Sequence, residues 1–116
     1  MENPKDYGFN SQLIHYSGHH DQYGAATVPI YQTSTFAFAS AQDGADCFAG
    51  VKPGYMYTRI GNPTVKALER QVALLEHACD SVALASGMAA VSCVYLALLN
   101  AGDHVVSSSA VYGASR

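Results

Sequence analysis

The chain has 116 residues, enough for one small domain, and 49% of them are hydrophobic, as in ordinary soluble globular proteins. A net charge of −3, with six Lys and Arg, argues against a nucleic-acid surface, which needs clustered cations. No apolar run reaches the roughly 18 residues of a membrane helix, and residues 1–6 lack the layout of a signal peptide, so we expect a cytoplasmic protein without a membrane partner.

The cysteines and histidines show no pattern typical of a disulfide framework or a metal site. Cys47, Cys79 and Cys93 are odd in number and far apart, which indicates reduced thiols. His15 and His19 have a spacing that could bind zinc on a helix, but a glycine between them and polar neighbours argue against a helix there. We therefore expect no metal.

Residues 7–61 show little helical periodicity and are rich in Tyr, Thr, Ser and Gly. Residues 27–36 are β-prone in composition, yet they lack a clean alternation and contain Pro29. Long segments without regular structure usually wrap around something or move, and disordered segments contain few aromatic residues. We therefore expect residues 1–61 to form an N-terminal arm that contacts a neighbouring subunit.

A different pattern begins at Asn62, a good helix cap, and Pro63, which is favoured at the first helical position. Apolar residues then recur at steps of three and four, which predicts an amphipathic helix to about His77. The recurring residues are Val65, Leu68, Val72 and Leu75.

The rest of the chain has the pattern of a strand, a helix and a second strand. Residues 82–85 and 105–106 predict short buried strands, and residues 88–99 predict an apolar helix that ends at residues 100–102. Such a unit predicts parallel strands with a right-handed crossover. The chain therefore divides near Asn62, and residues 62–116 form its second part.

Ligands of open parallel sheets bind beyond the carboxyl ends of the strands. Here those positions are residues 86–88 and 109–113, which we expect to be neighbours. Ser86, Gly87 and Met88 begin a helix whose N–H groups could bind an anion, although Ser-Gly is also a common helix cap. Tyr112 could stack on a flat ligand and exchange a proton, or be a half-buried tyrosine near a turn.

Tyr57 and Arg59 form a third candidate site. In an extended segment they would face the same way, and Arg binds phosphate in a bidentate manner; the alternative is a solvated Arg beside a packing Tyr. Because the pair lies in the arm, the phosphate could belong to a neighbouring subunit. Lys5, Lys52 and Lys66 lie outside the strand ends, and none is expected to form a Schiff base. No nucleotide-binding glycine loop is present.

Several ordered motifs together resemble the Cys/Met-metabolism family of pyridoxal 5'-phosphate (PLP) enzymes, which includes methionine γ-lyase, O-acetylhomoserine sulfhydrylase, cystathionine γ-synthase and cystathionine γ-lyase. The resemblance runs from about Gly8 to Arg116. It rests on VPIYQTSTF at 28–36, YTRIGNPT at 57–64, ASGMAA at 85–90, GDH at 102–104 and VYG at 111–113.

The resemblance implies an α/β fold of the aspartate-aminotransferase type (fold type I), of which this chain holds the arm and the start of the large parallel-sheet domain. It implies a homotetramer built as a dimer of dimers. Tyr57 and Arg59 would reach the PLP phosphate of the partner, and residues 86–88 would bind the phosphate of their own subunit. Tyr112 would stack on the pyridine ring and act as a catalytic acid near the leaving group.

The implied activity is that of a PLP-dependent carbon–sulfur lyase of methionine metabolism, acting by γ-elimination. Residues 44–50 resemble a segment of methionine γ-lyases, whereas Ala114 stands where those lyases usually have Cys. This departure keeps γ-replacement open, by an O-acetylhomoserine sulfhydrylase or a cystathionine γ-synthase. In the family the Schiff-base Lys and the substrate-carboxylate Arg lie downstream, so we expect a partial chain that is inactive alone. A non-catalytic binding or assembly piece is the alternative from another class.

Overall fold

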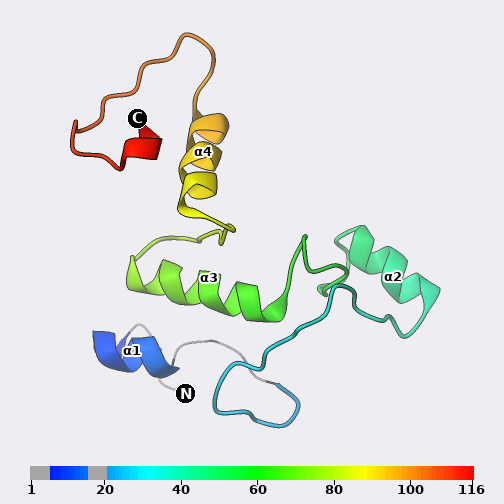
Figure 1. Cartoon of the computed structure of the whole chain (residues 1–116). Helices are drawn as coiled ribbons and strands as arrows, with labels where there is room; N and C mark the ends of the chain where they lie inside the picture. Colours follow the sequence, from blue (N-terminus) through cyan, green and yellow to red (C-terminus); the bar gives the residue numbers. More distant parts are fainter. Residues whose placement is uncertain (1–5, 16–20) are drawn as a thin grey trace. The chain divides into compact units, whose positions relative to one another are not determined.

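The computed structural model describes residues 6–15 and 21–116, which fall into two compact units (Figure 1). The first unit ends at Ser81, and the second runs from Val82 to Arg116. Within the described residues no helix combines the length and apolarity needed to cross a membrane. The elements are α1 (Phe9–His15), α2 (Ala41–Phe48), α3 (Pro63–Leu75), α4 (Gly87–Leu98) and the short 3-10 helix η2 (Gly113–Ser115).

Helices α1 and α2 lie in the region where the sequence predicted little helix, so that prediction was wrong at these positions. Helix α2 begins at Ser40, whose extended backbone and side-chain Oγ cap the helix by accepting the N–H of Asp43 at 3.1 Å. The Asp43 carboxylate in the first turn also suits the helix dipole. Ser40 with an acidic residue three positions later was a usable signal. His15 ends α1, while His19 lies outside the described residues.

Helix α3 begins where the sequence predicted. Asn62 has an extended backbone, with φ −145° and ψ 137°, and its side chain accepts the N–H of Thr64 at 2.9 Å. Pro63 occupies the first helical position, where its missing N–H costs no hydrogen bond. The predicted N-terminus is therefore confirmed, together with its physical cause.

The helix ends at Leu75, two residues before the expected limit, because the chain turns at His77. His77 has a positive φ of 53°, in the left-handed region that usually favours glycine. Its N–H donates to the Leu74 carbonyl at 3.1 Å, and the next N–H, of Ala78, donates to the Ala73 carbonyl at 2.8 Å. These two bonds form a Schellman cap, which satisfies carbonyl groups at the helix end.

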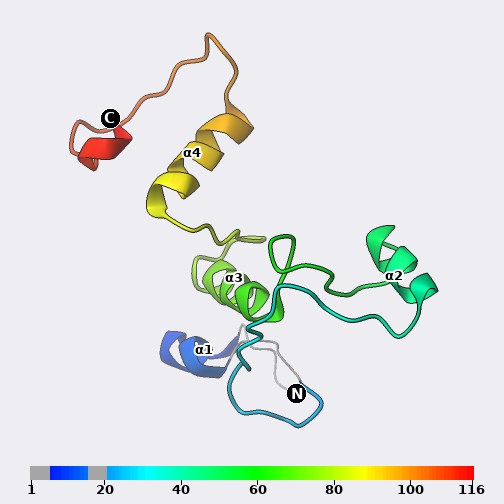
Figure 2. The ribbon, with the colours of Figure 1, turned by 45° about the vertical axis from the view of Figure 1, so that its right-hand side comes forward.

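The small core of the first unit lies between α1 and α3, which run side by side in both views of the ribbon (Figures 1 and 2). The side-chain Nε2 of Gln71 on α3 donates to the Gln12 carbonyl on α1 at 2.6 Å. Ala67, Ala73 and Leu74 of α3 are buried. These are not the residues of the predicted apolar stripe, of which Val65, Leu68 and Val72 stay 39%, 56% and 41% exposed. The helix was predicted correctly, but the face expected to be buried was wrong within the described residues.

A cluster of charged side chains fixes the chain that follows α3. The Lys66 ammonium lies 3.2 Å from Asp80 and 3.3 Å from Glu69, and Ser81 Oγ donates to the Glu69 carbonyl at 2.7 Å. The Ser81 N–H and then Lys66 lower the pKa of Asp80. The stabilisation that the Asp80 carboxylate contributes is therefore fully present above the pKa that Asp80 has in the unfolded chain. It is lost as the pH falls through the lower pKa that Asp80 has in the folded protein. Asp80 is exposed, so its ion pair with Lys66 contributes little to stability.

The second unit contains the predicted helix but not the predicted strands. Helix α4 runs from Gly87 to Leu98, one residue earlier at each end than expected. Residues 82–85 and 105–106 form no β-ladder in the part of the chain that the structure describes, and Val82 and Val106 are 74% and 100% exposed, where buried strands were expected. A strand exists only when a neighbour pairs with its backbone, and these two segments do not pair with each other. The division at residue 61 concerns subunit contacts, and it stays a prediction.

Candidate functional site

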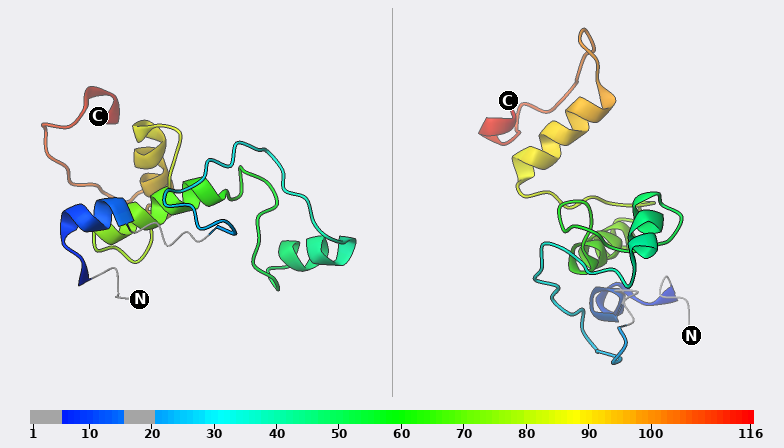
Figure 3. Two further views of the ribbon diagram at one scale, coloured as in Figure 1. Left: turned by 90° about the horizontal axis from the view of Figure 1, so that it is seen from below. Right: turned by 90° about the vertical axis from the view of Figure 1, so that its right-hand side faces the viewer.

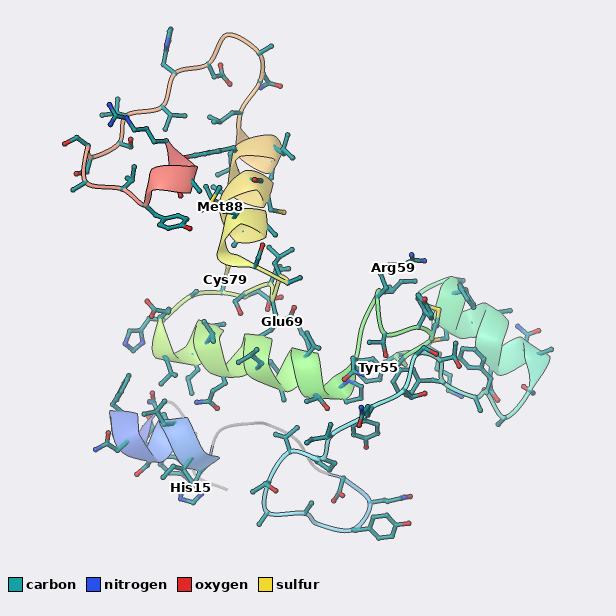
Figure 4. The ribbon with its side chains drawn as sticks, in the orientation of Figure 1. His15, Tyr55, Arg59, Glu69, Cys79 and Met88 are labelled. Carbon is teal, nitrogen blue, oxygen red and sulfur yellow. The ribbon has the colours of Figure 1, made fainter. Side chains whose placement is uncertain are left out.

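Tyr57 and Arg59 come together in a tight turn rather than in the extended segment that the sequence predicted. The N–H groups of Ile60 and Gly61 both donate to the Tyr57 carbonyl, at 2.9 and 3.0 Å. The Arg59 guanidinium carbon lies 5.0 Å from the centre of the Tyr57 ring, a cation–π contact. Figure 4 shows Arg59 at the outer edge of this turn. The pairing of the two side chains was expected, but its cause is the turn.

The turn is hydrogen-bonded to the segment of residues 31–36. Thr35 and Tyr57 form an isolated antiparallel bridge, and the Thr58 N–H donates to the Ser34 carbonyl at 2.8 Å. An open hollow of about 570 Å³ lies between residues 31–34 and residues 57–59. Two motifs that are more than twenty residues apart in the sequence therefore form one local structure.

Asn62 and Thr64 complete this structure from the start of α3. The Asn62 Nδ2 donates to the Tyr31 carbonyl at 2.9 Å and to the Thr58 Oγ1 at 3.1 Å. The Thr64 Oγ1 donates to the Pro29 carbonyl at 2.8 Å and accepts the Tyr31 N–H at 2.9 Å. The sequence indicated Asn62 only as a helix cap, because partners about thirty residues away leave no local signal.

The tip of α4 contains Ser86, Gly87 and Met88. Ser86 Oγ accepts the Ala89 N–H at 3.1 Å, so the cap that the sequence offered as an alternative is present. The N–H groups of Gly87 and Met88 have no protein acceptor among the described residues. A Cβ built on Gly87 would meet no atom within 4 Å, so the tip is open. The cap and an anion site are therefore compatible, because the cap uses the Ala89 N–H and an anion would use the N–H groups of Gly87 and Met88.

Tyr112 precedes η2, in the same unit as α4. It is 74% exposed, so it is not the half-buried tyrosine of the alternative interpretation. The Ser115 N–H donates to the Tyr112 carbonyl at 2.8 Å, and the Ser115 Oγ lies 3.4 Å from the Met88 sulfur. Figure 3 shows the chain after α4 looping back toward that helix. The contact with Met88 thus comes from Ser115, just after the expected residues 109–113, and the proximity of Tyr112 to residues 86–88 stays a prediction.

The lysines that the structure describes are paired with carboxylates. Lys52 Nζ lies 2.5 Å from Asp43, and Lys66 contacts Asp80 and Glu69. These partners raise the pKa of both ammonium groups, and the first cause is the hydrogen bond that Lys52 donates to Asp43 and that Lys66 donates to Asp80. A lysine that forms a Schiff base needs the opposite shift, so neither side chain is suited to that role.

The comparison with known families decides the assignment of the chain. The family model described as Cys/Met metabolism PLP-dependent enzyme matches residues 10–116. The chain belongs to this family. The resemblance inferred from the motifs is confirmed, and members of the family depend on PLP.

Curated relatives of the chain include methionine gamma-lyases and homoserine-ester sulfhydrylases. The chain is 47% identical over 109 residues to an L-methionine gamma-lyase of Fusobacterium nucleatum subsp. polymorphum, covering 94% of this chain and 28% of the relative. It is 42% identical over 112 residues to an O-acetyl-L-homoserine sulfhydrylase of Corynebacterium glutamicum, covering 96% of this chain and 26% of the relative. The chain therefore spans about a quarter of the length of the curated relatives it matches.

Solved structures agree with the predicted fold class. A putative O-acetylhomoserine (thiol)-lyase from Campylobacter jejuni, which contains N'-pyridoxyl-lysine-5'-monophosphate, matches with a TM-score of 0.83 and 29% identity. The match covers 95% of this chain and 27% of that one. Cystathionine gamma-lyase from Lactobacillus plantarum matches with a TM-score of 0.67 and 40% identity, covering 84% and 23%. The fold-type-I class is confirmed, although no sheet ladder forms within the described residues.

Proposed function

We propose that the whole protein is a PLP-dependent lyase that acts on methionine by γ-elimination. The observation that carries this proposal is 47% identity to a protein named L-methionine gamma-lyase over 94% of this chain. A second such enzyme, from Treponema denticola, is 45% identical over 91% of the chain. The sulfhydrylase of C. glutamicum follows at 42%.

The helix tip at residues 86–88 fits the phosphate of PLP. The N–H groups of Gly87 and Met88 lie at the positive end of the α4 dipole, where anions are stabilised. The open space above Gly87 allows close approach, and Ser86 keeps its hydroxyl proton for a phosphate oxygen while its oxygen caps the helix. When bound, PLP supplies the electron sink that allows a γ-substituent of an amino acid to leave.

Tyr57 and Arg59 hold the phosphate of the partner subunit in this proposal. The stack of the guanidinium on the Tyr57 ring limits the rotamers of Arg59 and leaves its N–H groups available to an anion. The turn lies in the first unit, which includes the proposed N-terminal arm, and Arg59 is exposed on it. This exposed side chain is therefore available to contact another subunit.

Tyr112 is the proposed catalytic residue of this chain. Its phenol is exposed, and the residue directly precedes η2, whose Ser115 contacts Met88 at the α4 tip. The ring can stack on a flat cofactor ring, and the hydroxyl can donate a proton to the leaving sulfur. It therefore serves both as a cofactor contact and as an acid.

The proposal extends to a homotetramer, a dimer of dimers, in the cytoplasm. Exposed apolar side chains suit subunit contacts, and in the first unit they include Ile30 at 81% and Phe48 at 70% exposed. The exposed thiols of Cys79 and Cys93 are free, which suits a reducing compartment. Such apolar exposure also argues against a non-catalytic piece that works as a monomer.

A substrate assay tests the activity. The whole protein with PLP should convert methionine to methanethiol, 2-oxobutanoate and ammonia, measured by thiol release and by 2-oxo acid formation. The absence of both products would remove methionine as the substrate.

The second candidate is an O-acetylhomoserine sulfhydrylase. It is favoured by the TM-score of 0.83 with the C. jejuni thiol-lyase and by Ala114, which stands where methionine γ-lyases usually have Cys. Formation of homocysteine from O-acetylhomoserine and sulfide, faster than methionine cleavage, would select this function.

Arg59→Ala tests the phosphate contact. We expect the Kd for PLP in the whole protein to rise about 10- to 100-fold, because charge-assisted hydrogen bonds to phosphate are lost. Cofactor binding to the PLP-free protein is followed by absorbance. Arg70→Ala is the matched control, because Arg70 lies exposed on α3. An Arg59 variant that binds PLP as tightly as the Arg70 control would contradict the role.

A further inference from the structure

We infer that Asn62 is a positioning residue for the PLP phosphate: it holds the turn that carries Tyr57 and Arg59 against residues 29–36. This inference rests on the proposed function, because it concerns the grip of Arg59 on the cofactor. It adds a role for a side chain that the sequence indicated only as a helix cap.

The Asn62 side chain is buried and its hydrogen-bonding capacity is used on both ends. It is 4% exposed. Its two amide hydrogens go to the Tyr31 carbonyl and to the Thr58 Oγ1, and its oxygen accepts the Thr64 N–H. A buried amide with these partners is rigid, because a rotation of the side chain would leave polar groups unsatisfied.

The contact with Thr58 transmits this rigidity to the turn. Thr58 also donates its N–H to the Ser34 carbonyl at 2.8 Å, and its hydroxyl donates to the Thr33 carbonyl. Three hydrogen bonds therefore fix Thr58, which lies between Tyr57 and Arg59 in the chain. An arginine on a fixed backbone loses less entropy when it binds phosphate than one on a mobile loop.

A cap alone does not require an asparagine at this position. Capping uses only the side-chain oxygen, which Asp or Ser would supply equally well. The two donor bonds, to Tyr31 and Thr58, require the amide NH₂ group. Asn62→Asp therefore separates the two roles, because it keeps the acceptor for Thr64 and removes both donors.

The test measures the Kd for PLP in the whole protein, starting from the PLP-free form. We expect Asn62→Asp to weaken binding about tenfold, the effect of one to two lost hydrogen bonds. The matched control is Asn10→Asp, the same chemical change at an exposed position of α1, which should leave the Kd unchanged. Hydrogen exchange of the Tyr31 and Thr58 amides in the PLP-free Asn62→Asp protein should accelerate.

A double-mutant cycle with Arg59→Ala distinguishes positioning from general destabilisation. If Asn62 acts through Arg59, the Asn62→Asp change should weaken PLP binding little further once Arg59 is absent. A loss of the same size in both backgrounds would mean that Asn62 acts only on stability, and would overturn the inference.

Thr58→Val provides a second variant in case the buried carboxylate at position 62 prevents folding. It removes the hydroxyl that joins Asn62 to the turn and should weaken PLP binding severalfold, whereas Thr58→Ser should stay closer to the parent. If the parent protein binds PLP and neither Asn62→Asp nor Thr58→Val changes the Kd, only this inference is overturned. If the parent binds no PLP, the proposed function is overturned as well.

Discussion

Helices α3 and α4 are similar in length but differ in what covers them. Helix α3 packs against α1 and buries Ala67, Ala73 and Leu74, and its face with Val65, Leu68 and Val72 stays exposed. Helix α4 is apolar on all sides, with the sequence GMAAVSCVYLAL, and buries none of its residues within the second unit. A partly polar helix such as α3 is typical of a protein surface, and a helix that is apolar on all sides, such as α4, is typical of the interior of a larger protein.

The contrast shows that helix formation and helix burial have separate causes. Both helices are capped by a polar side chain at the N-terminus, Asn62 for α3 and Ser86 for α4. Those caps act over three residues and need nothing from the rest of the protein. Burial needs a partner surface, which α3 finds in α1.

The largest expected effect comes from leucine truncations on the two helices. Leu74→Ala should lower the unfolding free energy of the whole protein by about 2–4 kcal/mol, because Leu74 is only 9% exposed. Leu96 is 83% exposed in this structure, yet we expect Leu96→Ala to cost a similar amount in the whole protein, because an all-apolar helix is covered there. Denaturant unfolding measures both, and a cost below about 0.5 kcal/mol for Leu96→Ala would show that α4 stays exposed.

Two serine caps, of which Ser40 also donates its hydroxyl to the Asp43 carboxylate at 3.0 Å, give a comparison of intermediate size. Ser40 and Ser86 each accept an N–H at 3.1 Å, from Asp43 and Ala89. Replacement of either serine by Ala should cost about 1 kcal/mol of stability. Only Ser86→Ala should also raise the Kd for PLP, because only α4 is proposed to bind the phosphate. Equal PLP affinity of the two variants would remove Ser86 from the site.

The smallest effects concern two positions with positive φ, His77 at the end of α3 and Gly102 in the turn of residues 100–103. His77, with φ 53°, adopts a backbone that glycine tolerates better, so His77→Gly should raise the unfolding free energy by about 0.5–1 kcal/mol. Gly102, with φ 100°, already has the suitable residue, and Gly102→Ala should lower the free energy by about 1 kcal/mol. Thermal unfolding of both variants measures the signs. A destabilised His77→Gly protein would mean that the imidazole has contacts that outweigh its backbone strain.

The sequence by itself determined the family, the fold class and the positions of α3 and α4. It did so because caps and apolar spacing act over a few residues, and because family motifs are local strings such as residues 57–64 and 85–90. A cap signal of the same kind was present for α2 at Ser40, but the α2 sequence AQDGADCF is too short and too poor in large apolar residues to show a stripe.

Only the tertiary structure decided the roles that depend on distant partners. The bonds from Asn62 to Tyr31 and from Thr64 to Pro29 join residues more than thirty positions apart, and the turn of Tyr57 and Arg59 rests on residues 34 and 35. The predicted strands at 82–85 and 105–106 failed to pair for the same reason: a strand is defined by its neighbour, and hydrophobic composition alone does not supply one.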